Sequence, residues 1–169
     1  MGFVNDVQLA HFVSPFRYGY SAGTWAADYD TEVVKNIRTA ADAEFDVVIP
    51  IELPGSEALN QGAKIKSIDI WYVIGTAAAD NFTGPAMAKM TLAATGVAVT
   101  GAAVTVSMDT GHDSAAECKA TGSHKMTVTP ATEFYLEDDY VYYIKFTVDA
   151  AATTVFSLIG AQINYQLRL

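Results

Sequence analysis

The stretch that decides the fold is Ile159-Gly-Ala-Gln-Ile-Asn-Tyr-Gln-Leu-Arg-Leu169, at the end of the chain. Apolar and polar side chains alternate along it almost without exception. The apolar positions are Ala161, Ile163, Tyr165, Leu167 and Leu169, and the polar positions are Gln162, Asn164, Gln166 and Arg168. Because successive side chains of a strand point to opposite faces, this period of two predicts a half-buried antiparallel strand.

The segment before it has the same period. Its apolar face carries Tyr140, Tyr142, Ile144, Phe146 and Val148. Residues 149–152 then separate the two segments, and this spacing predicts a β-hairpin with a four-residue loop. The aromatic and β-branched side chains suit the pleated surface of a sheet.

Shorter runs of the same kind occur upstream. Residues 45–53 alternate, but Pro50 has no N–H for a ladder, so this strand is predicted at a sheet edge or with a bulge. Residues 64–74 are apolar on both sides from Ile68 onward, which indicates a central strand. Further strands are marked by Ala88, Met90 and Leu92, by Val97 and Val99, by Val104, Val106 and Met108, and by Met126 and Val128. About eight short strands predict an all-β fold, namely an antiparallel β-sandwich or jelly roll. Residues 31–38 are the one fair candidate for a helix.

The first 44 residues have a different character. Five aromatic side chains crowd a Gly- and Ser-containing segment that has no sustained period, namely Phe12, Phe16, Tyr18, Tyr20 and Trp25. Such a segment is either an extended arm that docks on a neighbouring subunit or the first strands of its own domain. The expected organisation is therefore residues 1–44 as this arm or first strands, and residues 45–169 as the sandwich.

Composition narrows the classes of function. The chain has 169 residues, 51% of them hydrophobic, with mean hydropathy +0.19, and its formal charge is −9. This acidic balance argues against nucleic acid as a partner, since phosphates need a cationic face. No apolar run approaches the ~20 residues of a membrane helix, and the first residues lack the pattern of a secretory signal. The lone Cys118 excludes an intramolecular disulfide and any Cys-rich zinc site.

The sharpest local motif is Asp109-Thr-Gly-His-Asp113. Asp-Thr-Gly after an apolar strand resembles the catalytic loop of aspartic proteases, in which a homodimer would let two carboxylates share a proton. The alternative is a turn in which Asp109 bonds its own backbone. A candidate metal site is also formed by His112, Asp113 and Asp109, with His124 as a possible fourth ligand. The alternative interpretation is a surface loop that binds no metal. The turn and the metal-free loop are the preferred interpretations.

Other chemistry has less support. The chain contains no Gly-x-Ser-x-Gly motif, no phosphate-binding Gly loop and no recognisable His partner for Cys118. Several rings would form a sugar-stacking platform if they faced outward: Tyr135, Tyr140, Tyr142, Tyr143 and Trp71. Tyr140 and Tyr142 share a face with Ile144, which predicts core positions for both and leaves Tyr143 exposed. The sequence therefore predicts no catalytic residue, cofactor or metal.

Residues 45–169 resemble small β-rich virion structural proteins of tailed bacteriophages. The resemblance rests on Asp109-Thr-Gly-His-Asp-Ser-Ala-Ala-Glu117, Phe146-Thr-Val-Asp-Ala-Ala-Ala152, the C-terminal stretch quoted above and Gly62-Ala-Lys-Ile-Lys-Ser-Ile-Asp-Ile70. It implies a virion component assembled in the host cytoplasm, such as a head decoration (cement) protein or part of a fibre or tail.

These observations together predict a non-enzymatic, homotrimeric capsid decoration protein that stabilises a phage head. Its partners would be its own copies and the major capsid protein or another virion protein. The expected intersubunit or lattice contacts are Phe12, Phe16, Tyr18, Tyr20 and Trp25. Two alternatives remain open: a carbohydrate- or receptor-binding module of a tail or fibre, and a dimeric aspartic protease centred on Asp109.

Overall fold

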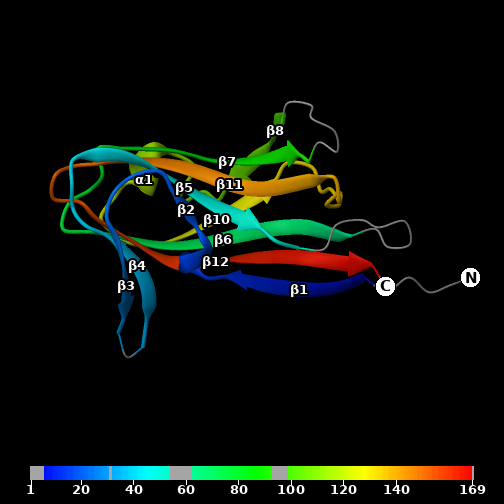
Figure 1. Ribbon diagram of the computed structural model, residues 1–169, viewed down its shortest axis with the longest axis horizontal. Helices are drawn as coiled ribbons and strands as arrows, with labels where there is room; N and C mark the ends of the chain where they lie inside the picture. Colours follow the sequence, from blue (N-terminus) through cyan, green and yellow to red (C-terminus); the bar gives the residue numbers. More distant parts are fainter. Residues whose placement is uncertain (1–5, 31, 54–61, 93–98, 169) are drawn as a thin grey trace, which may run out of the picture.

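The computed structural model describes residues 6–30, 32–53, 62–92 and 99–168 as two antiparallel sheets packed face to face (Figure 1). The strands are β1 (Asp6–Val13), β2 (Gly19–Tyr20), β3 (Trp25–Tyr29), β4 (Val34–Arg38), β5 (Ala43–Ile51), β6 (Ala63–Gly75), β7 (Asn81–Thr91), β8 (Gly101–Val104), β9 (Val106–Met108), β10 (Gly122–Pro130), β11 (Tyr140–Ala150) and β12 (Val155–Arg168). One sheet runs β3-β4-β12-β6-β10-β9, with β1 also paired to β12, and the other runs β2-β5-β11-β7-β8. The predicted all-β sandwich is confirmed, with more strands than the eight expected.

The core lies between the two sheets and is built by the alternation seen in the sequence. Ala161 and Ile163 of β12 face it from one sheet, and Ile144, Phe146 and Val148 of β11 face it from the other. The long strand at residues 64–74 is central, as predicted, since β6 lies between β12 and β10. Leu169 and Val97, which the sequence assigned to strands, lie outside the described residues.

The predicted hairpin between the last two strands is wrong. β11 pairs with β5 and β7, whereas β12 pairs with β6, β4 and β1 in the opposite sheet. The short connection therefore crosses from one layer to the other. Buried Thr154 fixes this crossing, because its N–H donates to Ala151 O at 3.0 Å and its hydroxyl donates to Ala78 O at 3.0 Å.

A second crossing divides the strand predicted at Val104, Val106 and Met108. Val104 of β8 pairs with Met87 in the five-stranded sheet, and Val106 of β9 pairs with Pro130 in the seven-stranded sheet. The chain thus changes sheets at Thr105, as strands do at the corners of sandwiches.

The strand that the sequence marked by Ala88, Met90 and Leu92 is β7, but these three residues do not form its buried face. Met87 is buried and Leu92 is exposed, the opposite of the alternation expected from Ala88, Met90 and Leu92. The register between β11 and β7 slips between Lys145 and Thr147, and an irregularity of this kind moves a strand's side chains to the other face. Pro50 fits its prediction better: it lies in β5 beyond the two residues that β2 covers.

The helix predicted at residues 31–38 is wrong, because Val34–Arg38 forms β4. Pairing of β4 with β12 places Arg38 beside Phe156 and buries it, and this tertiary contact overrides a weak local preference. The α-helix that does form is α1 (Ala115–Cys118), which begins with a capping box between Ser114 and Glu117. A short 3-10 turn, η1, spans Pro15–Arg17. No helix of the described part of the chain is long and apolar enough to cross a membrane.

Residues 6–44, for which an arm and first strands were both open, contribute β1 to β4 and the start of β5. β1 pairs with β12 over its whole length, from Asp6 opposite Arg168 to Val13 opposite Ala161. β2 pairs with β5, and β4 adds to β12 beyond the end of β1. This segment is thus integrated into the sheets of its own chain.

Candidate functional site

The five aromatic residues expected at an interface divide into two groups. Tyr18 is buried, and Tyr20 stacks on Trp25 with ring centroids 3.9 Å apart, both half-buried against the core. Phe12 and Phe16 remain on the surface, 56% and 41% exposed. Three of the five rings therefore stabilise the fold, and two are accessible to a partner.

Phe16 belongs to a small apolar surface that the sequence did not single out. Its ring lies 5.7 Å from that of Tyr29, and Tyr29 pairs across the β3–β4 hairpin with Val34. Tyr29 is 73% exposed and Val34 is 46% exposed. We call Phe16, Tyr29 and Val34 the hairpin patch. Figure 1 shows the β3–β4 hairpin projecting away from the two layers, so the patch is open to a partner.

The Asp109 loop is a turn after β9, as preferred from the sequence. Asp109 Oδ1 accepts the Gly111 N–H at 3.0 Å, and Oδ2 accepts the Thr127 N–H at 2.6 Å. Oδ1 also faces His112 Nδ1 at 2.9 Å. Burial acts to raise the pKa of the Asp109 carboxyl, but these hydrogen bonds outweigh burial and lower the pKa below its usual range. Both oxygens are therefore held by the protein's own donors.

His112 and His124 continue a chain of close polar contacts that begins at Asp109. His112 Nε2 lies 3.2 Å from His124 Nδ1, and His124 Nε2 lies 2.8 Å from Ala120 O. Tyr72 stacks on His124 with centroids 4.6 Å apart. Each ring nitrogen thus faces a protein atom. Within the described ranges, no three His, Cys, Asp or Glu side chains converge in a metal-binding arrangement.

The outward side of the seven-stranded sheet carries a different set of groups. Its inward positions, such as Ile68, Ile70 and Tyr72, are buried in the core, so the alternate residues face out. We call this surface the outer face and define it by Gln8 and Phe12 of β1, Gln162 and Asn164 of β12, Asp69 and Trp71 of β6, and Lys125 and Thr127 of β10. Strand pairing sets Phe12 opposite Gln162, Gln162 opposite Asp69, and Asp69 opposite Thr127.

Hydrogen bonds connect these side chains across strands. Asp69 accepts from Thr127 Oγ1 at 2.7 Å and Asn164 Nδ2 at 3.3 Å, and it pairs with Lys125 Nζ at 3.2 Å. Asn164 Oδ1 in turn accepts from Gln162 Nε2 at 2.9 Å. Asp69 is nearly buried beneath this network. The polar groups are therefore fixed in position before any ligand arrives.

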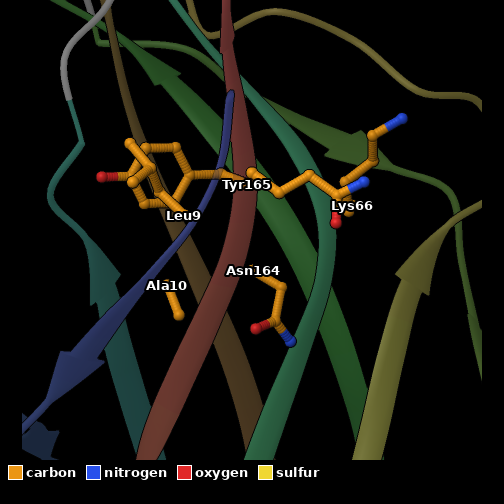
Figure 2. A pocket seen from close by; sticks show the side chains of 6 residues that line it. Leu9, Ala10, Lys66, Asn164 and Tyr165 are labelled. Atoms are coloured by element: carbon orange, nitrogen blue, oxygen red, sulfur yellow. The ribbon is translucent and has the colours of Figure 1, made fainter. Parts of the chain in front are cut away.

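A shallow groove of about 590 Å³ opens beside the network, between β1, β12 and β6. Its lining consists of Gln8, Leu9, Ala10, Lys66, Asn164 and Tyr165. Figure 2 shows Leu9 and Tyr165 together on one side of β12, with Asn164 and Lys66 on the other. The Leu9 and Tyr165 side chains therefore point to the other side of the sheet, where Tyr165 packs against the core. On its outward side the groove offers an occupant amide and ammonium groups from Gln8, Asn164 and Lys66.

Comparisons with known proteins assign neither a family nor a function to the chain. No protein-family model matches the chain, and no curated protein matches it. Solved structures that it resembles include TmCBM61 in complex with β-1,4-galactotriose, at 12% identity and TM-score 0.39, covering 92% of this chain and 91% of that one. Another is a conserved carbohydrate esterase from the Shiga toxin-encoding bacteriophage phi24B, at 17% identity and TM-score 0.38, covering 99% and 100%. The α-L-arabinofuranosidase MgGH51 matches at 8% identity and TM-score 0.34, over 92% of this chain and 23% of that one. At these values, function has to be argued from this chain's own residues.

Proposed function

We propose that this chain is a non-enzymatic structural protein of a tailed-phage virion that forms a homotrimer and decorates the head. The observation that carries the proposal is the hairpin patch, in which Phe16, Tyr29 and Val34 lie exposed on a projecting hairpin. Rings on a projecting element offer apolar contact area that partner copies or the capsid lattice can bury. The resemblance of residues 45–169 to virion proteins supplies the phage context.

The size of the patch suits repeated contacts. Covering the exposed parts of these three side chains stabilises an assembly by roughly 2–5 kcal/mol per copy, since full burial of one large apolar side chain is worth ~1.5–3 kcal/mol. Such a contact is weak in isolation. Symmetric assembly repeats it, so a trimer gains affinity for a lattice without one large interface.

The absence of catalysis is part of the proposal and is supported by the Asp109 loop. A shared-proton pair of carboxylates needs oxygens that can approach each other, whereas both oxygens of Asp109 accept backbone N–H groups. The parent chain is expected to cleave no peptide at acidic pH. Cleavage that disappears in Asp109→Asn would contradict this part of the proposal.

The first test is the solution mass of the untagged protein, measured by light scattering after gel filtration. Wild type is expected at the mass of a trimer, and the double variant Tyr29→Ser, Val34→Ser at the mass of a monomer. Val141→Ser is the matched control, because Val141 is 37% exposed but lies on β11 of the other sheet. A wild-type monomer, or a patch variant that keeps the trimer mass, would contradict the trimer.

The second test is co-sedimentation with phage heads that lack this protein. Wild type and Val141→Ser are expected to sediment with the heads, and the patch variant to stay in solution. Point variants are needed because deleting residues 1–25 would remove β1 and uncover the edge of β12. Equal sedimentation of all three proteins would refute the role of the patch.

A further inference from the structure

The outer face carries two aromatic rings, those of Phe12 and Trp71, next to Gly160. Trp71 of β6 pairs with Gly160 of β12, and the Phe12 ring covers Gly160 so closely that a Cβ there would collide with it. Phe12 is largely exposed and Trp71 is half-buried. Lys125 Nζ lies 5.7 Å from the Trp71 ring centroid on the far side. An apolar ligand face can therefore lie against both rings on the same sheet surface.

Amide groups lie next to these rings with hydrogen-bonding capacity to spare. Gln162, which pairs with Phe12, donates through Nε2 to Asn164, and within the described ranges no protein donor reaches its Oε1. Gln8 lies four residues from Phe12 along β1, about 13 Å at the rise of a strand, and its exposed side chain lines the groove. The rings and the groove thus form one elongated surface.

The charges on this surface balance one another. Lys125 pairs with Asp69, and Lys64 and Lys66 both pair with Glu133. Paired ammonium groups favour an uncharged ligand over a phosphate or a polyanion, as does the net charge of −9. The ligand that fits is neutral, rich in hydroxyl groups and apolar on one face.

We infer that the outer face, together with the groove beside it, binds a neutral oligosaccharide. The C–H face of one pyranose stacks on Phe12 and Trp71, and its hydroxyl groups bond to the Gln162 amide. The next units extend along β1 into the groove, where Gln8 and Lys66 donate to hydroxyl oxygens. Aromatic faces with a few fixed polar groups are the usual chemistry of small-molecule recognition. This activity is separate from docking through the hairpin patch.

The probes are neutral hexasaccharides of glucose, galactose, mannose and xylose, in α-1,4 and β-1,4 linkage where these exist, titrated into the full chain by calorimetry. Saturable binding of at least one is expected. For that hexasaccharide, Trp71→Ala is expected to weaken binding about ten-fold or more, and Gln162→Ala about three- to ten-fold. Gln162 is an outward polar residue, so its variant keeps the fold even if Trp71→Ala does not.

Trp25→Phe is the control, because Trp25 stacks on Tyr20, where both pack against the core, and lies off the outer face. Its affinity is expected to equal that of wild type. The Tyr29→Ser, Val34→Ser variant is expected to bind the sugar normally, and Gln162→Ala to keep the trimer mass, so this inference and the proposed function fail separately. No saturable binding of any hexasaccharide, or full affinity in Gln162→Ala and a folded Trp71→Ala, would overturn the inference.

Discussion

Gly160 is the position where the structure makes the sharpest stability prediction. Its φ is +153°, which lies in the region that favours glycine, and the β12–β6 register slips between Leu158 and Gly160. A Cβ at this position would collide with the Phe12 ring and stand 3.2 Å from Val13 O. Gly160→Ala therefore meets two separate obstacles, one in its own backbone and one in β1.

The free-energy cost of each obstacle can be estimated separately. An alanine forced into an unfavourable backbone region costs about 1–3 kcal/mol, and overpacking against a neighbour costs about 1–3 kcal/mol more. Gly160→Ala is thus expected to lower the free energy of unfolding by roughly 2–6 kcal/mol. Phe12→Ala alone is expected to cost about 1 kcal/mol, because the ring is already 56% exposed and full burial of a Phe is worth ~1.5–3 kcal/mol.

A double-mutant cycle distinguishes the two obstacles. In Phe12→Ala, Gly160→Ala the collision with the ring is gone, whereas the backbone strain and the 3.2 Å approach to Val13 O remain. The double variant is therefore expected to be more stable than the sum of the two single losses predicts, by about 1–3 kcal/mol. Urea unfolding of the four proteins, followed by near-ultraviolet circular dichroism, measures the coupling. Additive losses would refute the placement of the Phe12 ring over Gly160.

Three further predictions concern ionisable side chains. Asp109→Asn is expected to lower the free energy of unfolding by about 1–3 kcal/mol in urea titrations, because the Asn side chain has one acceptor oxygen and its NH₂ group would face the other backbone N–H. Hydrogen bonds from Lys64 and Lys66 hold the pKa of Glu133 at about 2, below its ordinary 4.5, so its contribution to stability is present above pH 4.5 and is lost as the pH falls towards 2. Glu133→Gln should therefore be less stable than wild type at neutral pH and equal to it in strong acid, and a constant difference in urea midpoint across this range would contradict the ion pairs. Burial raises the pKa of the Cys118 thiol to about 11, so iodoacetamide at pH 8 should alkylate it only in the unfolded chain; rapid alkylation of the native protein would show otherwise.

The strands that the sequence predicted well are those with one buried face. In β12 and β11 the inward residues are apolar and the outward residues mostly are not. Because only one face of each strand is buried, every second residue in the sequence is apolar. Ile163 and Phe146 are examples that the pattern placed correctly in the core. The number of residues between strands, in contrast, does not say whether the chain turns back beside itself or crosses to the facing sheet. The connection from β11 to β12 has a length that suits both.

Errors arose where a tertiary contact decides a local conformation. Arg38 ends a segment with fair helical preference, yet it lies buried in β4, donates to Ala41 O and Ala43 O, and covers the Phe45 ring. The aromatic residues of the N-terminal segment gave a similar ambiguity. Tyr18 and Trp25 pack on the core and Phe16 does not, and nothing in their spacing distinguishes the two outcomes.

The outer face could not have been predicted from the sequence, because its members are far apart along the chain. Asp69, Thr127 and Asn164 meet only when β6 pairs with β10 on one side and β12 on the other. The sequence did single out Trp71 as a possible stacking ring, but it grouped Trp71 with Tyr140, Tyr142 and Tyr143, which lie in β11 of the other sheet. The signal that could have indicated the network is the set of polar positions in the β12 alternation. Gln162 and Asn164 there carry uncharged amide groups, whereas the outward positions of a solvent-exposed strand often carry charges.

The same alternation explains why structure and function can be tested separately in this fold. β12 pairs with β1, β4 and β6, so it is the strand on which the seven-stranded sheet depends. Its inward residues, such as Ile163, hold the core, and their truncation is expected to cost about 2–5 kcal/mol. Its outward residues, such as Gln162, lie on the opposite side of the same backbone and contribute little to that core. A variant of Gln162 that loses sugar binding with an unchanged urea midpoint therefore reports on the outer face alone, whereas a variant of Ile163 reports on the fold.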